Sequence, residues 1–316
     1  MKKLISLVAA ALLSSAAFTQ IRAGVLKGPS GIPMAYQMEN VHELEGQKIQ
    51  YEVFSQANML LPKLIKGEID IGFLPPNVAA KVYNAGNGKI VCAAVSGNGM
   101  LYLLTKDSSI KSLADLKGRE LSVAVAGAGA TPEYMFRYLL EKNNVREGSF
   151  PNSLYLNMSI PTADIAAALI SGQVQCALVP EPFATVACTK DKSVIRAVDI
   201  QKEFASAGGS KTFPMTLIVV NADYLKNHEK EVEAFLSEYK KASDWTVKNP
   251  GEAGKLVQKH ELGLNAAVVE KAVPSCAFVF ERGKDAQKRI EELLNIFLTF
   301  DSTSIGGKFP DKGFYY

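Results

Sequence analysis

The stretch Lys63–Ala79, KLIKGEIDIGFLPPNVA, is repeated in weaker form by Ala167–Phe183, AALISGQVQCALVPEPF. Each copy is typical of a helix that ends at a glycine, a short buried strand, and a proline-bearing turn that starts another helix. Gly67 and Gly172 stand where the residue after a helix adopts a positive φ. Two copies of one αβα unit predict two similar α/β lobes. The turns at the ends of their strands would line a cleft between the lobes.

Apolar runs typical of strands alternate with amphipathic runs typical of helices along the rest of the chain, which predicts α/β lobes with largely parallel sheets. We place the first lobe at residues 20–105 and 212–316 and the second at residues 106–211, so that the chain crosses between the lobes twice. Helices after the second crossing, such as Glu229–Lys248, should pack on the outer faces. The predicted strands are Ile21–Leu26, Ile49–Phe54, Ile69–Leu74, Ile90–Ser96, Leu101–Thr105, Leu121–Val125, Val174–Val179, Ile195–Val198 and Phe213–Val220.

Residues 1–19 are typical of a secretory signal peptide and are expected to lie outside the fold. Lys2 and Lys3 give a positive start, Leu4–Leu13 is apolar, and Ser15–Ala17 offers small residues for cleavage. The apolar run is too short to span a bilayer, which takes about 20 residues. Since no cysteine lies near the cleavage site to carry a lipid anchor, we expect a soluble, periplasmic mature chain.

Charge and cysteine content exclude other classes of protein. The formal net charge is +3, and no basic run is interleaved with aromatic residues, so we expect no nucleic-acid partner. The four cysteines, Cys92, Cys176, Cys188 and Cys276, match no zinc-site spacing, and we predict no metal and no cofactor. Because Cys92 and Cys176 lie in apolar strand-like runs, buried free thiols are favoured, with a Cys176–Cys188 disulfide as the open alternative.

Further segments join the repeat in an ordered set. The first predicted strand is followed by Gly28–Pro33, GPSGIP; the first copy contains the pattern LxxGxIDxxxLPP over Leu64–Pro76; a strand, a small-residue loop and a helix follow at Leu116–Glu133; and Gly306–Asp311 reads GGKFPD. Together they resemble the substrate-binding proteins of ABC importers, above all the branch that binds nitrate, sulfonates, taurine and thiamine-pyrimidine precursors. The resemblance implies the type II periplasmic-binding-protein fold, with two α/β lobes, a ligand cleft between them and two crossings. It also implies a monomer that binds a small molecule and delivers it to an ABC permease in the inner membrane.

Strand-end turns expose backbone N–H groups at helix N-termini, and these can hold polar or anionic groups of a ligand. The loop Gly127–Thr131 is the strongest case, because small residues let a ligand approach the backbone and Thr131 suits a helix N-cap. The plainer interpretation of these positions is structural, namely simple turns, with Asn77 as a helix cap and Glu181 as a surface carboxylate. The candidate ligand-binding residues are Ser30, Gly31, Ile32, Ser55, Asn58, Pro76, Asn77, Ser96, Gly97, Asn98, Gly127, Gly129, Ala130, Thr131, Glu181 and Phe183.

The charge near the predicted cleft bears on the ligand. Lys27 and Lys211 are the only cations that we place close to it, and Glu181 adds a negative charge. A fully charged sulfonate or nitrate would be expected to use Arg, Lys or several helix N-termini. We therefore favour a neutral or partly cationic organic ligand, such as a thiamine-precursor-like heterocycle, with a sulfonate as the alternative.

Two other functions are compatible with the same fold. Some relatives implied by the resemblance are enzymes that make menaquinone or thiamine precursors, but this chain carries neither GxSxG nor HExxH. A sensor that reports its ligand to a membrane receptor would use the same cleft. We favour transport, in which this chain is not an enzyme and ATP is hydrolysed by a separate protein, since no GxxxxGK[ST] P-loop is present.

Overall fold

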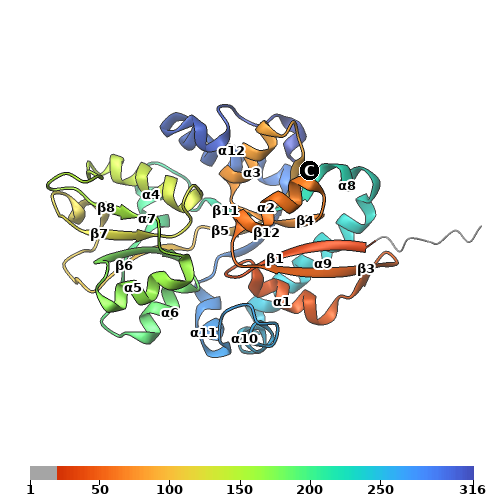
Figure 1. The fold of residues 1–316 in the computed structure, drawn as a ribbon, viewed down its shortest axis with the longest axis horizontal. Helices are drawn as coiled ribbons and strands as arrows, with labels where there is room; N and C mark the ends of the chain where they lie inside the picture. Colours follow the sequence, from red (N-terminus) through yellow and green to blue (C-terminus); the bar gives the residue numbers. More distant parts are fainter. Residues whose placement is uncertain (1–19) are drawn as a thin grey trace, which may run out of the picture.

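The computed structural model describes residues 20–316, so the predicted signal peptide lies outside the described residues. Two separate sheets, each with its own helices, lie side by side, and β5 and β11 run between them in the view of Figure 1. The strands are β1 (Gln20–Leu26), β2 (Glu43–Leu44), β3 (Gln47–Phe54), β4 (Ile71–Leu74), β5 (Ile90–Asn98), β6 (Leu101–Thr105), β7 (Ser122–Val125), β8 (Tyr155–Asn157), β9 (Cys176–Pro180), β10 (Ile195–Asp199), β11 (Pro214–Asn221) and β12 (Phe278–Arg282). The helices are α1 (Gly31–Asn40), α2 (Ala57–Lys66), α3 (Pro76–Ala85), α4 (Thr131–Lys142), α5 (Ile165–Ser171), α6 (Phe183–Lys190), α7 (Ile200–Ser206), α8 (Ala222–Asn227), α9 (Glu229–Lys248), α10 (Pro250–Lys259), α11 (Ala266–Ala272) and α12 (Gly283–Phe300).

The first lobe is built on a seven-stranded sheet of order β12-β5-β11-β4-β1-β3-β2, and the second on a five-stranded sheet of order β10-β6-β9-β7-β8. Figure 1 shows α1, α9, α10 and α11 on one side of the larger sheet and α2, α3 and α12 on the other. The smaller sheet is enclosed by α4, α5, α6 and α7. Helices on both faces explain why strands such as β4 and β9 are buried along their whole length.

The repeated segment forms the predicted unit in both lobes. The helix α2 ends at Gly67 with φ 69°, and α5 ends at Gly172 with φ 79°, so both glycines adopt the left-handed cap conformation. Each is followed by a buried central strand, β4 or β9, and then by the next helix, α3 or α6. The prediction of two α/β lobes from this repeat is confirmed.

The prediction of largely parallel sheets is wrong, because six of the ten strand pairs are antiparallel. In the first lobe β3, β1 and β4 are parallel, but β11 pairs antiparallel with both β4 and β5. In the second lobe β8, β7 and β9 are parallel, but β6 pairs antiparallel with β9 and β10. Four of these six pairs involve β6 or β11, which enter their sheets from the edge where the parallel strands end and therefore run in the opposite direction.

The boundary of the first lobe also needs correction. The strand Leu101–Thr105, placed in the first lobe from the sequence, is β6 and pairs in register with Pro180–Cys176 of the second lobe. The first crossing is therefore the short link after Asn98. Its backbone lies against the returning chain, because the Gly99 N–H donates to the Phe213 carbonyl at 2.8 Å. An apolar run predicts a strand but does not reveal which sheet the strand joins.

Within residues 20–316, no helix is long and apolar enough to cross a membrane. The same residues include all four cysteines, and each is a free thiol, so the alternative Cys176–Cys188 disulfide does not form in this structure. Burial raises the pKa of the Cys176 thiol to about 11, which keeps this side chain protonated at neutral pH.

Candidate ligand-binding site

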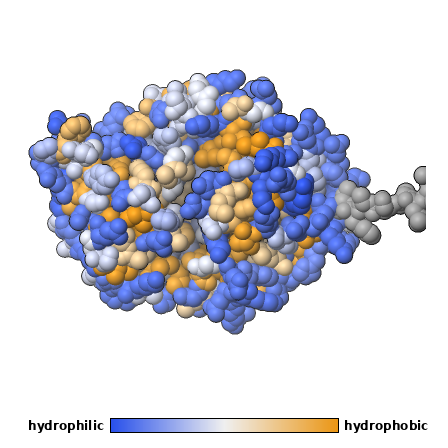
Figure 2. All heavy atoms as spheres, in the orientation of Figure 1, coloured by the Kyte–Doolittle hydropathy of each residue, from blue (hydrophilic) through white to orange (hydrophobic). Residues whose placement is uncertain are grey.

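Turns from the two lobes meet at the edge where the parallel strands of both sheets end. The turn after β4 contacts the loop after β7, and the turn after β1 lies against the start of α6. Ligand sites in open α/β sheets form at this carboxyl edge. Figure 2 shows a narrow hollow where the two lobes adjoin on this face of the molecule.

Asn77 forms a bridge of two hydrogen bonds between the lobes. Its Nδ2 donates to the Gly129 carbonyl at 2.9 Å, and its Oδ1 accepts from the Thr131 hydroxyl at 3.1 Å. Asn77 is 1% exposed and Thr131 is fully buried, so both side chains are enclosed by the contact. Asn77 is therefore not the simple helix cap that the plainer interpretation suggested; α3 is capped by Pro75 without a side-chain hydrogen bond.

A second contact lies between the turn after β1 and Phe183. A Cβ atom on Gly28 would sit 3.6 Å from the Phe183 ring, and Gly28 has φ +118°, a conformation that other residues rarely adopt. The ring is half-buried, so part of its face stays available for a ligand. Ser30 is 7% exposed, and its hydroxyl does not cap α1, which leaves that hydroxyl free for another partner.

The loop after β7 has the backbone conformation that its small residues allow. Gly127 and Gly129 have φ of 74° and 71°, and the Ala130 N–H donates to the Gly127 carbonyl at 2.9 Å. The predicted N-cap is wrong by one residue: Ala130 is the N-cap, and Thr131 is the first residue of α4. The Thr131 hydroxyl donates to Asn77 instead of capping the helix. Glu133 already accepts from the Gly129 N–H at 2.7 Å, so a protein carboxylate occupies part of the anion-binding capacity expected here.

Glu181 is fully buried and its carboxylate is bonded inside the second lobe. Oε1 accepts from Nε and Nη2 of Arg196 at 3.0 and 2.5 Å, and Oε2 accepts from the Thr185 N–H at 3.0 Å. It is therefore not the surface carboxylate of the plainer interpretation. The opposite charge of Arg196 also removes the reason for taking Glu181 as evidence of a cationic ligand.

Arg196 is one of the residues that sequence reasoning missed. Burial lowers the pKa of Arg196, but its attraction to and hydrogen bond with Glu181 outweigh this, so that the pKa is raised overall. Its guanidinium also lies 5.5 Å from the centre of the Tyr102 ring. The available signal was an arginine within the predicted strand Ile195–Val198, which had been taken as plain lobe structure.

The candidates at the end of β5 anchor the crossing. The Asn98 N–H donates to the Ala277 carbonyl at 2.9 Å, and its Oδ1 accepts from Nη2 of Arg289 at 2.7 Å. The Ser96 hydroxyl donates to the Thr216 carbonyl at 3.3 Å. These side chains are therefore held by protein groups next to the first crossing. Arg289 was missed because α12 carried no signal beyond that of an outer helix.

The remaining candidates divide by burial. Ile32 is 1% exposed and belongs to the core of the first lobe, so only its backbone could contact a ligand. Gly31 packs against β1, since a Cβ there would lie 2.4 Å from the Leu26 carbonyl oxygen. Ser55 and Asn58 are exposed after β3. The other two, Pro76 and Gly97, are buried at strand ends.

Comparison with known proteins places this geometry in context. The NMT1-like family model matches residues 25–259. No curated protein matches the chain significantly. An ABC transporter structure from Parabacteroides distasonis is 25% identical, with 94% of this chain and 99% of that chain covered and a TM-score of 0.77.

More distant structures share the fold. The periplasmic aliphatic sulphonate binding protein SsuA from Escherichia coli is 18% identical, with 94% of this chain and 92% of that chain covered and a TM-score of 0.73. A Candida albicans protein described by its generic periplasmic binding protein fold is 12% identical, with 91% and 94% covered and a TM-score of 0.62. The two-lobed architecture is therefore the periplasmic-binding-protein fold, as the sequence resemblance implied.

Proposed function

Because the chain belongs to the NMT1-like family, we propose that it is the exported solute-binding component of an ABC-type importer. It would close its lobes on a small organic nutrient in the periplasm and deliver it, as a monomer, to a membrane permease. The observation that carries the proposal is the bridge from Asn77 to Gly129 and Thr131 across the two lobes. A contact of this kind holds the lobes shut around a solute and gives the closed form a distinct shape.

The charges around the site favour an uncharged ligand. Glu181 is paired with Arg196 at 2.5 Å, and Glu133 is paired with Arg137 at 2.9 Å, so these ionic groups are satisfied by the protein. What stays available is the backbone of the strand-end turns, the Ser30 hydroxyl and the half-buried ring of Phe183. This set suits a small planar heterocycle of the thiamine-precursor kind, which can stack on the ring and bond to backbone groups. A sulfonate is the second candidate ligand.

Native mass spectrometry of the protein purified from its own host tests this directly. We expect a bound small molecule whose mass identifies its class. Calorimetry with hydroxymethylpyrimidine and with taurine then separates the two candidate ligands, and binding of taurine alone would overturn the preference for a heterocycle. A protein that carries no solute and binds neither compound would contradict the proposal itself.

The same material separates transport from the other functions. If the protein is an enzyme, the retained solute will change mass on incubation; if it is a binding protein, the solute will be recovered unchanged. Addition of the loaded protein to its reconstituted permease and ATPase should increase ATP hydrolysis. A loaded protein without this effect would favour the sensor.

A further inference from the structure

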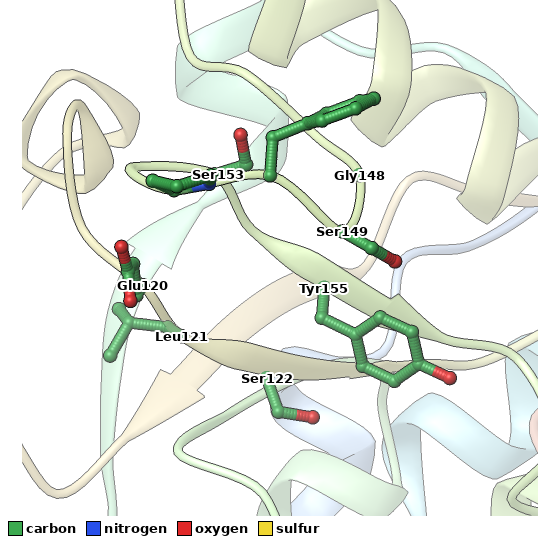
Figure 3. Close-up of a pocket in the computed structure, with 9 residues that line it drawn as sticks. Glu120, Leu121, Ser122, Gly148, Ser149, Ser153 and Tyr155 are labelled. Carbon is green, nitrogen blue, oxygen red and sulfur yellow. The ribbon is translucent and has the colours of Figure 1, made fainter.

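The second lobe carries a surface cavity that the solute site does not use. It has a volume of about 440 Å³ and lies where β7 and β8 begin, beside the loop that precedes β8 (Figure 3). The loop Gly127–Thr131 follows the other end of β7, so the cavity and the interlobe site lie at opposite ends of the same strand. The cavity is open to solvent in this structure.

The loop that forms one wall is held in a fixed conformation. The Gly148 N–H donates to the Leu154 carbonyl and the Leu154 N–H to the Arg146 carbonyl, each at 2.9 Å. Oε1 of Glu120 accepts from the Asn152 N–H at 2.9 Å, which ties the loop to the strand entry. Gly148 has φ +133°, and a Cβ there would lie 2.9 Å from the Phe150 ring, so the ring rests on the bare glycine backbone. The wall is therefore preformed.

Two aromatic side chains border the cavity and are left in water. Phe150 is 72% exposed and Tyr155 is 55% exposed, although exposure of such rings is unfavourable. Phe150 is the most exposed large hydrophobic residue among those that the structure describes. Figure 3 shows the side chains of Tyr155 and its register partner Ser122 extending to the same side of the two strands. Exposed rings next to a concavity are typical of a binding surface.

The polar lining is rich in hydroxyl groups and poor in charge. Ser122, Ser149 and Ser153 line the cavity. Ser153 is 5% exposed, and its Oγ has no hydrogen-bond partner among the described residues. Glu120 is the only ionisable carboxylate in the lining, and no Lys or Arg takes part. The Ser153 Oγ is itself shielded from solvent, so the polar groups that a ligand can reach are those of Ser122, Ser149 and Glu120.

From these features we propose that the cavity binds one sugar unit of a neutral oligosaccharide. A pyranose ring has an apolar face that packs on an aromatic ring and an edge of hydroxyls that both donate and accept hydrogen bonds. Tyr155 and Phe150 supply the apolar surface, and Ser122, Ser149 and Glu120 supply the polar partners. The missing cation argues against an anionic ligand.

An NMR titration of the full mature protein tests the site. The probes are cellotetraose, maltotetraose, chitotetraose and a mannotetraose. Each is added to about 10 mM, which exceeds the Kd of about 1 mM that we expect for so open a site; that Kd corresponds to a binding free energy of about 4 kcal/mol. We expect at least one probe to shift the amide signals of residues 120–122 and 148–155 in a saturable way. Tyr155→Ala and Phe150→Ala should each weaken binding at least tenfold. Phe309→Ala, which removes an exposed ring elsewhere, is the matched control and should not change the affinity.

The outcomes decide between occupants. No shift with any of the four sugars would overturn the proposal, as would equal affinity in the two aromatic variants and the wild type. The variants are checked for folding by their remaining amide signals. Because β8 is an edge strand, an extended peptide is the competing ligand. If a peptide probe shifts the amide signals along β8 and no sugar does, the sugar proposal is overturned. Solute binding between the lobes should be unchanged in all three variants, so this test does not depend on the proposed function.

Discussion

The two lobes follow the same strand order from different sequences. In the first lobe the order β5-β11-β4-β1-β3 matches β10-β6-β9-β7-β8 of the second, including which pairs are parallel and which antiparallel. The entering strands β11 and β6 occupy equivalent places, and so do the central strands β4 and β9 of the repeated segment. The comparison shows that two sequences with little in common outside the repeated segment form the same strand order and the same pattern of strand directions.

The lobes differ at the turns that follow the central strands. After β4, Asn77 directs its amide across to Gly129 and Thr131 of the other lobe. After β9, Glu181 stays within its own lobe, where it bonds to Arg196 and Thr185. Glycine caps and buried strands therefore set the shared scaffold, whereas a few turn residues decide whether a lobe bonds to its neighbour or to itself.

The largest effect should come from removing the internal network of the second lobe. Glu181→Ala leaves Arg196 half-buried without its carboxylate and the Thr185 N–H without its acceptor, and should lower the free energy of unfolding by about 3 kcal/mol. Urea unfolding followed by circular dichroism measures the change. Asp244→Ala, which removes an exposed pair with Lys240, is the control and should cost less than about 0.5 kcal/mol. Equal costs for the two variants would show that Glu181 is not a structural anchor.

Asn77→Ala should affect solute binding more than stability, whereas Glu181→Ala should affect stability more than binding. The variant loses both bonds across the lobes, so solute affinity should fall about tenfold, or about 1.4 kcal/mol, through a less stable closed form. Thr131→Val removes one of the same bonds and should have a smaller effect in the same direction. Calorimetry with the retained solute gives the affinities. If affinity is unchanged in both variants, the bridge does not contribute to closure.

The two glycine caps should respond alike. A Cβ on Gly172 would have no neighbour within 4 Å, and one on Gly67 would lie 3.6 Å from Nδ2 of Asn221, so neither substitution creates a clash. Gly67→Ala and Gly172→Ala should therefore each cost about 1 kcal/mol, through the positive φ alone. Urea unfolding of the two variants side by side is the measurement. If the two losses in the free energy of unfolding differ by more than about 1 kcal/mol, the two copies are not structurally equivalent.

The sequence predicted those features that depend on local pattern. The helix Glu229–Lys248 was predicted with its observed bounds, and both glycine caps were correct, because helix periodicity and a left-handed cap are local properties. The sheet that Leu101–Thr105 joins was predicted wrongly, since pairing with Pro180–Cys176 depends on residues far along the chain. The partners of Glu181 and Asn98 were also missed, because a sequence shows charges but not which arginine lies beside them.

The smallest expected effect concerns two ion pairs at equivalent corners of the lobes. Lys106 follows β6 and pairs with Asp191, which precedes β10, at 2.8 Å; Asp223 follows β11 and pairs with Lys89, which precedes β5, at 3.3 Å. The two positions thus carry equivalent ion pairs with the charges exchanged: the lysine follows the entering strand in the second lobe, and the aspartate follows it in the first. Asp191 is the less exposed carboxylate, at 24% against 65% for Asp223. Hydrogen bonds from Lys106 and then Ser193 lower the pKa of Asp191 to about 2, and the bond from Lys89 lowers the pKa of Asp223.

A depressed pKa in the folded state stabilises the protein above the unfolded pKa, which is 3.8 for Asp, and the stabilisation is lost as the pH falls toward 2. Asp191→Asn should therefore be less stable than the wild type at about pH 6, and the difference should shrink at about pH 2.5. Asp223→Asn should show the same trend with a smaller amplitude, because water screens the more exposed pair. The urea midpoints of the three proteins at both pH values give the comparison. A difference for Asp191→Asn that is the same at both pH values would show that the bond to Lys106 does not stabilise the protein. The two lobes would then be equivalent in backbone arrangement but not in these ion pairs.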